Sequence, residues 1–158
     1  MTLVVRRATI DDARLLALLN SDVQAIHAAA LPWRFKPPSA ESFSAAETIA
    51  LLGNPDNLFF VAQDGNEPAG YVYAEIVRRP ETARVYASEM ILIHHISVRP
   101  GHRRKGIGTA LIEATRAAGR DLAIETLALD VWRFNDGARE FFGHQGFDVY
   151  IERLWNRQ

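Results

Sequence analysis

The stretch "VRPGHRRKGIGTALI", residues 98–112, joins the end of an apolar, β-type run to the start of an amphipathic helix. A loop that ends with Gly106 and Gly108 at a helix start turns several backbone N–H groups toward one point, because glycine adopts backbone angles that other residues resist. The helix N-terminus adds partial positive charge, and the Arg-Arg-Lys run at 103–105 raises the local potential. The stretch therefore predicts a phosphate or pyrophosphate site between a strand and a helix.

Neither standard nucleotide motif explains this loop. A nucleoside-triphosphatase loop needs lysine and then serine or threonine after its last glycine, whereas Gly108 is followed by Thr109 and Ala110. A dinucleotide fingerprint needs a third glycine three residues after the second, and Leu111 stands there. The anion must therefore be held by another kind of loop.

Capping patterns before the loop predict two helices. Thr9 and Asp12 form a capping-box pattern that opens a helix reaching to about residue 30. A second helix, capped by Ser39 or Ser44, ends near Gly53. These helices and their connection are expected to form a lid or substrate wall.

Runs of β-forming residues predict the strands. An apolar segment at 2–8 is the first, and the residues at 57–77 form a hairpin around an Asp-Gly-Asn turn. The run at 84–98 is longer than a typical strand, so a bend or bulge is expected in it. Strands are also expected at 123–132 and, closing the chain, at 147–155.

The remaining segments predict helices that alternate with these strands. Apolar residues recur at helical spacing from Ile107 through Leu111 to Ala118, and residues 135–144 form a second, short helix. A hairpin followed by alternating strands and helices indicates an α/β (α+β) fold with a mixed sheet and helices on its faces. At 158 residues the chain is expected to be one domain, 1–158.

Composition excludes several classes of function. A net charge of −1 argues against a whole-protein field that recruits nucleic acid or an anionic membrane. The absence of cysteine excludes disulfides, thiolate metal sites and a cysteine nucleophile. No metal-ligand spacing is present, so no metal is expected. With neither a signal peptide nor an apolar run of membrane-spanning length, a soluble, cytoplasmic protein is the expectation.

Two segments together resemble a known superfamily. The run from Val98 to Gly108 resembles the coenzyme A pyrophosphate loop of the GNAT superfamily of acetyl-CoA-dependent N-acetyltransferases. The run "LDVWRFNDGAREFFGHQGF" is similar to that superfamily's Asn-x-x-Ala segment, with Asn135 and Ala138 in those positions and a Gly-Phe pair at 146–147. The resemblance covers nearly the whole chain.

The resemblance implies a mostly antiparallel sheet splayed in a V, with acyl-CoA between residues 92–98 and 125–132 as co-substrate. The pantetheine arm would pair with strand backbone near Val98, and the pyrophosphate would take loop amides from about Arg104 to Thr109. The residues that the resemblance assigns to coenzyme A are Ile96, Val98, Arg103, Arg104, Lys105, Gly106, Ile107, Gly108, Thr109, Asn135, Ala138 and Phe142.

The implied chemistry is acyl transfer to an amine, which must lose its proton before it attacks. His94 is the first candidate for relaying that proton and His95 the second, because they lie on the strand lining the implied cleft. Strand alternation predicts that one faces the cleft and the other the opposite layer. Many relatives carry a tyrosine acid where Phe142 stands, and phenylalanine cannot donate a proton.

The sequence thus predicts an N-acetyltransferase that uses acetyl-CoA by direct attack in a ternary complex. A non-catalytic acyl-CoA-binding module is the alternative, and a nucleic-acid-binding domain using residues 99–105 is a weaker one. The acceptor stays open as a small-molecule or peptide amine. A homodimer also stays open, since strands at the cleft edge of such folds often pair between chains.

Overall fold

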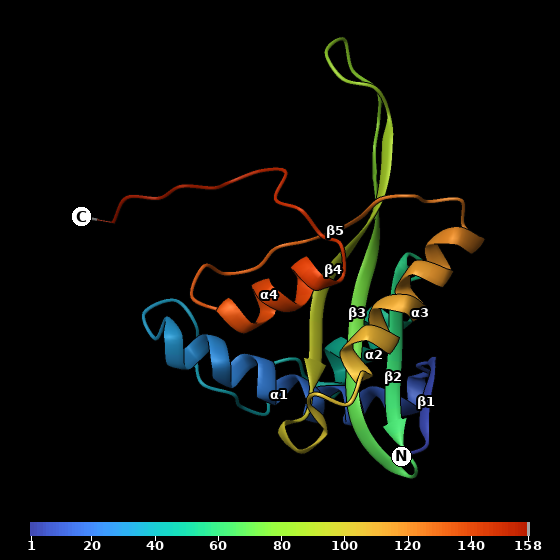
Figure 1. Cartoon of the computed structure of the whole chain (residues 1–158), viewed down its shortest axis with the longest axis vertical. Coiled ribbons are helices and arrows are strands. Elements are labelled where there is room, and N and C mark those ends of the chain that lie inside the picture. The colour runs from blue at the N-terminus through green and yellow to red at the C-terminus, as the bar shows by residue number, and fades with distance from the viewer. Residues whose placement is uncertain (158) are drawn as a thin grey trace.

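The computed structural model describes residues 1–157 and contains one five-stranded sheet. The strands follow the chain order in space, and the first three pairings are antiparallel while the last is parallel (Figure 1). Their bounds are β1 (Leu3–Arg7), β2 (Asn57–Asp64), β3 (Glu67–Arg79), β4 (Ser88–Val98) and β5 (Leu127–Leu129). The prediction of a mixed, mostly antiparallel sheet is confirmed.

Four α-helices cover the two faces of the sheet, as predicted (Figure 1). Their bounds are α1 (Ala13–Ala30), α2 (Ala45–Leu52), α3 (Ile107–Asp121) and α4 (Asp136–His144). A cluster containing Leu16, Tyr71 and Tyr73 packs beneath α1 and α2, and a larger cluster containing Leu111 and Phe142 packs beneath α3 and α4. In residues 1–157, no helix has both the length and the apolarity needed to cross a membrane.

The sheet opens between its last two strands. Residues 91–93 of β4 pair with residues 127–129 of β5, and the pairing extends no further. The strand predicted at 123–132 is therefore only three residues long, Leu127–Leu129. From His94 to Val98, the edge of β4 that faces β5 has no strand partner, although the other edge stays paired with β3. The Val98 carbonyl accepts Arg103 Nε over 3.1 Å, and the other backbone groups on this open edge are available to an extended ligand.

The predicted irregularity in the long strand is a β-bulge at His94. Pairing with β3 steps from His95 opposite Tyr73 directly to Ile93 opposite Ala74, which leaves His94 as the extra residue. A bulge shifts the alternation of the residues that follow it. It lies at the point where β5 stops pairing with β4.

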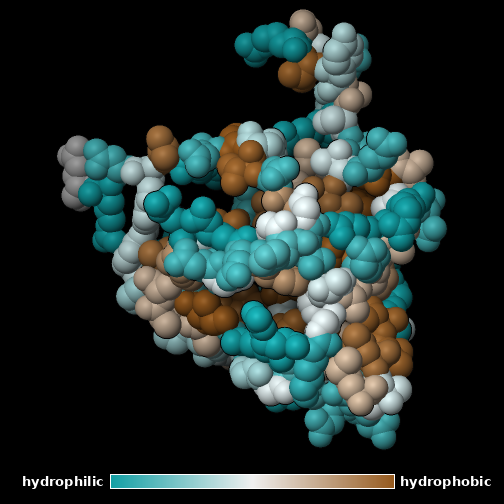
Figure 2. Space-filling model, viewed as in Figure 1, coloured by the Kyte–Doolittle hydropathy of each residue, from teal (hydrophilic) through white to brown (hydrophobic). Residues whose placement is uncertain are grey.

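The predicted strand at 147–155 is wrong. Helix α4 ends at His144, Gly146 follows with a φ of 83° in the left-handed region, and residues 148–157 have no ladder partner. This C-terminal arm, residues 148–157, reaches away from β5 until Trp155 stacks on Trp33 with ring centroids 5.1 Å apart. Figure 2 shows open gaps between the arm and the body. Strand-forming side chains alone did not suffice, because a strand needs a partner for its backbone hydrogen bonds and these residues pair with none of the five strands.

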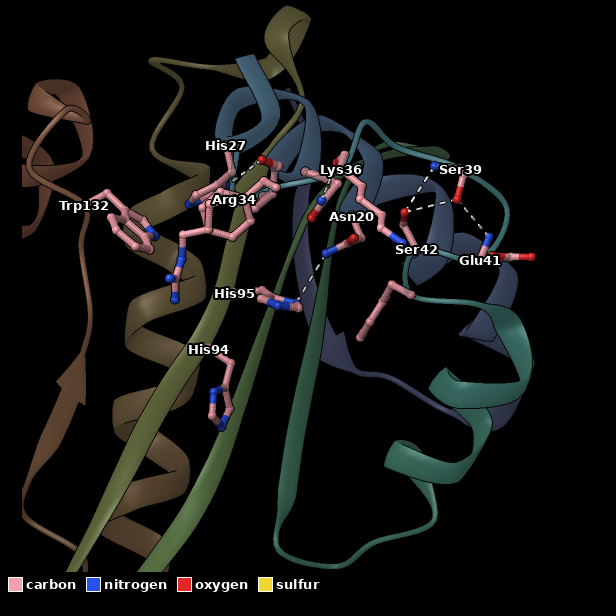
Figure 3. A pocket seen from close by; sticks show the side chains of 14 residues that line it. Asn20, His27, Arg34, Lys36, Ser39, Glu41, Ser42, His94, His95 and Trp132 are labelled. Atoms are coloured by element: carbon pink, nitrogen blue, oxygen red, sulfur yellow. Dashed lines mark hydrogen bonds between the residues drawn. The ribbon is translucent and has the colours of Figure 1, made fainter. Parts of the chain in front are cut away.

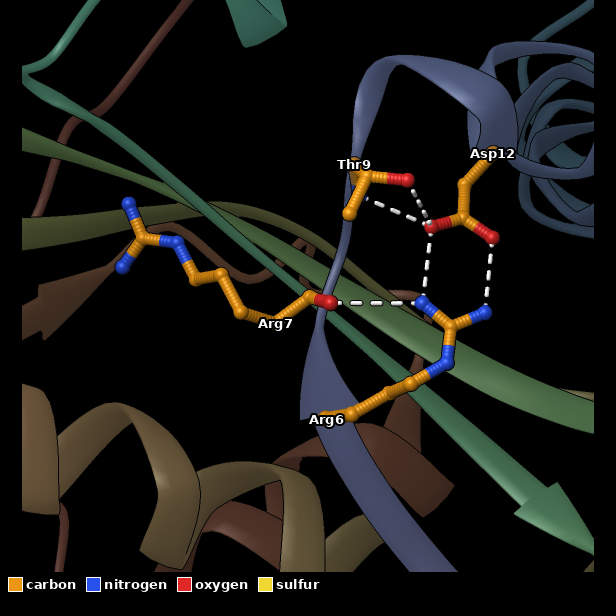
Figure 4. Close-up of polar contacts among 4 residues, drawn as sticks. All are labelled: Arg6, Arg7, Thr9 and Asp12. Carbon is orange, nitrogen blue, oxygen red and sulfur yellow. Dashed lines mark hydrogen bonds and ion pairs between the residues drawn. The ribbon is translucent and has the colours of Figure 1, made fainter.

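A bidentate ion pair joins β1 to the start of α1 (Figure 4). The two terminal guanidinium nitrogens of Arg6, Nη1 and Nη2, each lie 2.8 Å from one carboxylate oxygen of Asp12. Asp12 also accepts the Thr9 backbone N–H over 2.8 Å, which completes the capping box predicted from the sequence. The Arg6 guanidinium holds the pKa of the Asp12 carboxyl below its usual value. The carboxylate therefore fixes the entry of α1 onto the sheet.

We expect Asp12→Ala to lower the free energy of unfolding by about 2 kcal/mol, since the change removes charge-assisted bonds and the cap together. Asp11→Ala is the matched control, because Asp11 is exposed and takes no part in this network. Urea unfolding followed by circular dichroism measures both. Equal losses in the two variants would show that the ion pair does not anchor the helix.

Candidate active site

A cavity of 650 Å³ lies between α1, the α1–α2 connection and the bulged part of β4 (Figure 3). Helix α1 contributes Asn20 and His27, β4 contributes His94 and His95, and Trp132 lines it from beyond β5. A volume of this order suits a small molecule. The cavity therefore adjoins the open edge of β4.

Both histidines line this cavity, so the expectation that they would face opposite layers is wrong. Ile93 and Ile96 pack against the cluster beneath α3, and the two residues between them both turn to the α1 face. There each ring contacts Tyr73, with centroids 5.0 Å away for His94 and 5.6 Å for His95. The bulge is the cause, because the extra residue interrupts the strict alternation of a strand.

His95 is held in one tautomer by two neighbours. Asn20 Nδ2 donates to the Tyr71 hydroxyl oxygen over 2.9 Å, so the hydroxyl hydrogen is directed to His95 Nδ1, 3.2 Å away. Asn20 Nδ2 is also 3.3 Å from that nitrogen. Because both neighbours donate, Nδ1 accepts and the ring hydrogen lies on Nε2. Burial, reinforced by His94, lowers the pKa of His95 to about 4, so the ring is neutral at pH 7.

His94 forms a pair with a carboxylate on the neighbouring strand. Its Nε2 lies 2.7 Å from Glu75 Oε2, and both side chains keep about a third of their surface exposed, 33% and 40%. When Nε2–H donates to Glu75, the lone pair of the neutral ring lies on Nδ1. This arrangement orients the ring as a base with Nδ1 free. The two histidines thus differ in chemistry, since one is locked as a neutral donor and the other is paired with an acid.

The glycine-rich loop has the backbone geometry that an anion site needs. Arg104 and Gly106 both have left-handed backbone, with φ of 63° and 77°, and Gly106 is the N-cap of α3. In an α-helix the first backbone N–H groups have no partner in a preceding turn, and here they belong to residues 107–109. A Cβ built on Gly106 meets no atom within 4 Å, so open space lies in front of the cap.

The side chains predicted to bind coenzyme A fall into three groups. Arg103, Arg104, Lys105 and Thr109 are exposed around the loop. Ile96 and Val98 are half-buried at the end of β4, where their backbone lies on the open edge. Ile107, which is 1% exposed, belongs to the core, so only its backbone can face a ligand.

The second motif holds α4 against α3. Asn135 caps α4 by accepting the Ala138 N–H over 3.2 Å, and Ala138 packs against the larger cluster. The Phe141 ring packs against Gly108 on α3. A Cβ added at Gly108 would lie only 3.0 Å from this ring, so a larger residue there would crowd it. Phe142 is 7% exposed and packs within the larger cluster. Its ring therefore fills the core.

The partners of the two histidines belong to no motif in the sequence. Asn20 lies on a helix and Glu75 on a strand remote in the chain, so neither forms a motif with residues 94–95. A charged residue within the apolar strand β3 was the one available signal for Glu75. Among residues 1–157, no group of three acidic, histidine or cysteine residues is placed to hold a metal ion.

Comparisons with known proteins agree with this architecture. A model of the acetyltransferase (GNAT) family matches residues 21–147. N-acetyltransferase 8F1 of Rattus norvegicus is 26% identical over 123 residues, which cover 78% of this chain and 54% of that protein. An uncharacterized N-acetyltransferase of Methanocaldococcus jannaschii is 31% identical over 98 residues, covering 62% and 42%. The chain thus spans about half the length of these curated relatives.

Solved structures share the fold over nearly the full chain. A tetramutant of the BH1408 protein from Bacillus halodurans has a TM-score of 0.93 at 21% identity, covering 98% of this chain and 99% of that one. The aminoglycoside N-acetyltransferase AAC(6')-Iy in complex with CoA has a TM-score of 0.78 at 17% identity, covering 99% and 95%. These likenesses show the fold, and the match of the family model over most of the chain shows that it belongs to the acetyltransferase (GNAT) family.

Proposed function

We propose that the protein transfers an acetyl group from acetyl-CoA to a primary amine by direct attack in a ternary complex. The observation that carries this proposal is the coincidence of the bulge, the end of β5 pairing and the two histidines at one cavity. The sequence has no cysteine to form an enzyme thioester, so direct attack is the economical route.

The donor site fits coenzyme A at two places. The backbone amides at the start of α3 and the exposed cations around the loop suit a pyrophosphate. The unpaired edge of β4 from His94 to Val98 suits an extended amide chain such as pantetheine, which pairs as a further strand would. AAC(6')-Iy, which shares the fold, was solved with CoA, and this supports the assignment.

His94 is proposed as the base that receives the amine proton. An alkylammonium has a pKa of about 10, so attack at neutral pH needs a proton acceptor at the site. Glu75 lies 2.7 Å from His94 Nε2, where it accepts the ring N–H and orients the ring with Nδ1 free. The cavity is open to solvent at this residue, which gives the proton an exit.

His95 is proposed as a hydrogen-bond donor to the oxygen on which charge develops. Its Nε2–H is fixed by the Asn20 and Tyr71 contacts at Nδ1, and its neutrality at pH 7 follows from burial. A preorganised donor stabilises an oxyanion without reorganisation during the reaction. Departure of the thiolate is proposed to need no protein acid, because Phe142 carries no ionisable group and a thiol pKa near 8.5 makes thiolate a fair leaving group.

Gly106→Asp is expected to weaken acetyl-CoA binding at least tenfold, because a carboxylate would stand at the helix N-terminus where the pyrophosphate is proposed. Gly65→Asp is the matched control, since Gly65 also has left-handed backbone, with φ of 62°, and open space around its Cβ. Calorimetric titration with acetyl-CoA measures both variants. No binding by the folded wild type, or equal loss in the two variants, would refute the proposed donor site.

His94→Ala is expected to lower kcat at least a hundredfold, and Glu75→Gln is expected to lower it about tenfold. The affinity for acetyl-CoA should stay unchanged in both variants. The reason is that the first change removes the base and the second only its orienting partner. His144→Ala, an exposed histidine at the end of α4, is the control. Thiol release with the best amine from a broad panel measures kcat, and full activity of His94→Ala would exclude the proposed base.

The free energy of unfolding should fall as the pH drops from about 6.5 to about 4. In this range His95 binds a proton in the unfolded protein and stays neutral in the folded protein. His95→Gln should remove that part of the fall. Urea unfolding at a series of pH values tests this, with His144→Gln as the exposed control. An unchanged slope in His95→Gln would mean that His95 is not held neutral.

A further inference from the structure

Two cations from the α1–α2 connection line the cavity that holds the histidines. Arg34 and Lys36 both belong to its lining, together with His95 (Figure 3). In residues 1–157, neither side chain has a carboxylate within 4.0 Å. The two charges are thus available to a ligand in the cavity.

The segment that carries these cations is held in place. The Arg34 guanidinium carbon lies 5.2 Å from the ring centre of Trp132 and 5.8 Å from that of Phe35. The side-chain amide of Gln24 on α1 donates to the backbone carbonyl of Lys36 over 2.7 Å. The backbone N–H of Arg34 donates to the backbone carbonyl of Leu31 over 2.9 Å. The charges are therefore placed by stacking and hydrogen bonds, which lowers the entropy cost of binding an anion.

The lining of the cavity carries more positive than negative charge. Glu41 is the one acidic residue in the lining, and Figure 3 shows its carboxylate pointing away from the histidines. Arg34, Lys36 and Glu41 therefore give the lining a charge of +1 apart from its histidines. Glu75 lies outside this lining and is engaged by His94 Nε2.

A cavity of this sign discriminates between amines. It repels an ammonium ion with further positive charges, such as a polyamine or an aminoglycoside. A carboxylate on the same molecule reverses the sign of the interaction, and a guanidinium can bind it through two parallel hydrogen bonds. Nearby cations also favour the uncharged form of the amine, which is the form that attacks.

We propose that the acceptor is a small amine that carries a carboxylate, of the amino-acid class, with Arg34 and Lys36 binding the carboxylate while the amine faces His94. This inference rests on the proposed acetyl transfer. Starting from the uncharged amine, the nitrogen forms a bond to the acetyl carbon, the bond from that carbon to sulfur breaks, the sulfur leaves as thiolate, and the one proton lost by the nitrogen passes to His94.

The test compares each amino acid with its own amide, which keeps the amine and side chain and lacks the carboxylate. The best amino acid should show a kcat/KM at least tenfold above that of its amide, and spermidine and an aminoglycoside should be poorer than both. Amides or polycations that match or exceed the amino acids would overturn the inference.

Charge variants tie the preference to the two residues. Arg34→Gln and Lys36→Gln should each reduce the ratio of amino acid to amide several-fold, and Lys36→Glu should bring it to one or below. Arg14→Gln, an exposed arginine on α1 outside the cavity lining, should leave it unchanged. Both cavity cations are exposed, so these variants are expected to fold, which circular dichroism checks.

Calorimetry with acetyl-CoA separates failure of this inference from failure of the proposed function. If acetyl-CoA binds and polyamines or amides are acetylated in preference, the substrate class is wrong and the acetyltransferase proposal stands. If acetyl-CoA does not bind to the folded protein, the proposed function itself fails. An unchanged ratio of amino-acid to amide kcat/KM in Lys36→Glu and in Arg34→Gln would contradict the role of the two cations.

Discussion

Because His94 is inserted opposite the step from Tyr73 to Ala74 on β3, both imidazoles of β4 turn to the face covered by α1. Without the extra residue, the strict alternation of a strand would place one ring in the apolar cluster beneath α3. The pairing of β5 ends at Ile93, one residue before the bulge. The same point of the strand therefore opens the sheet and directs both side chains to the cavity.

The surroundings of each imidazole make the two histidines chemically different. Contacts with Asn20 and Tyr71, together with burial, keep His95 neutral with its hydrogen on Nε2. Glu75, which lies on the α1 face of β3 because it follows Tyr71 and Tyr73 at two-residue spacing, holds His94. In the proposed reaction one ring receives a proton and the other donates a hydrogen bond, and neighbouring side chains set both roles.

Local sequence signals predicted most of the fold. The Thr9 and Asp12 cap, the turn at Gly65 and the helical spacing from Ile107 all appear where expected, because each depends on residues close in the chain. The direction of the two histidines could not be predicted, since the position of a bulge depends on pairing with another strand. For the same reason Asn20 and Glu75 were missed, and the strand predicted at 147–155 does not form, because strand-forming residues do not by themselves supply a pairing partner.

In the proposed reaction, the bulge at His94 brings the donor thioester and the acceptor cavity together. A crystal structure of the protein with acetyl-CoA is the most direct test. We expect electron density for pantetheine along the open edge of β4 from His94 to Val98, the pyrophosphate at the N-terminus of α3, and the acetyl group beside His94 and His95. Density for the acetyl group away from this cavity, or for the pyrophosphate away from Gly106, would contradict it.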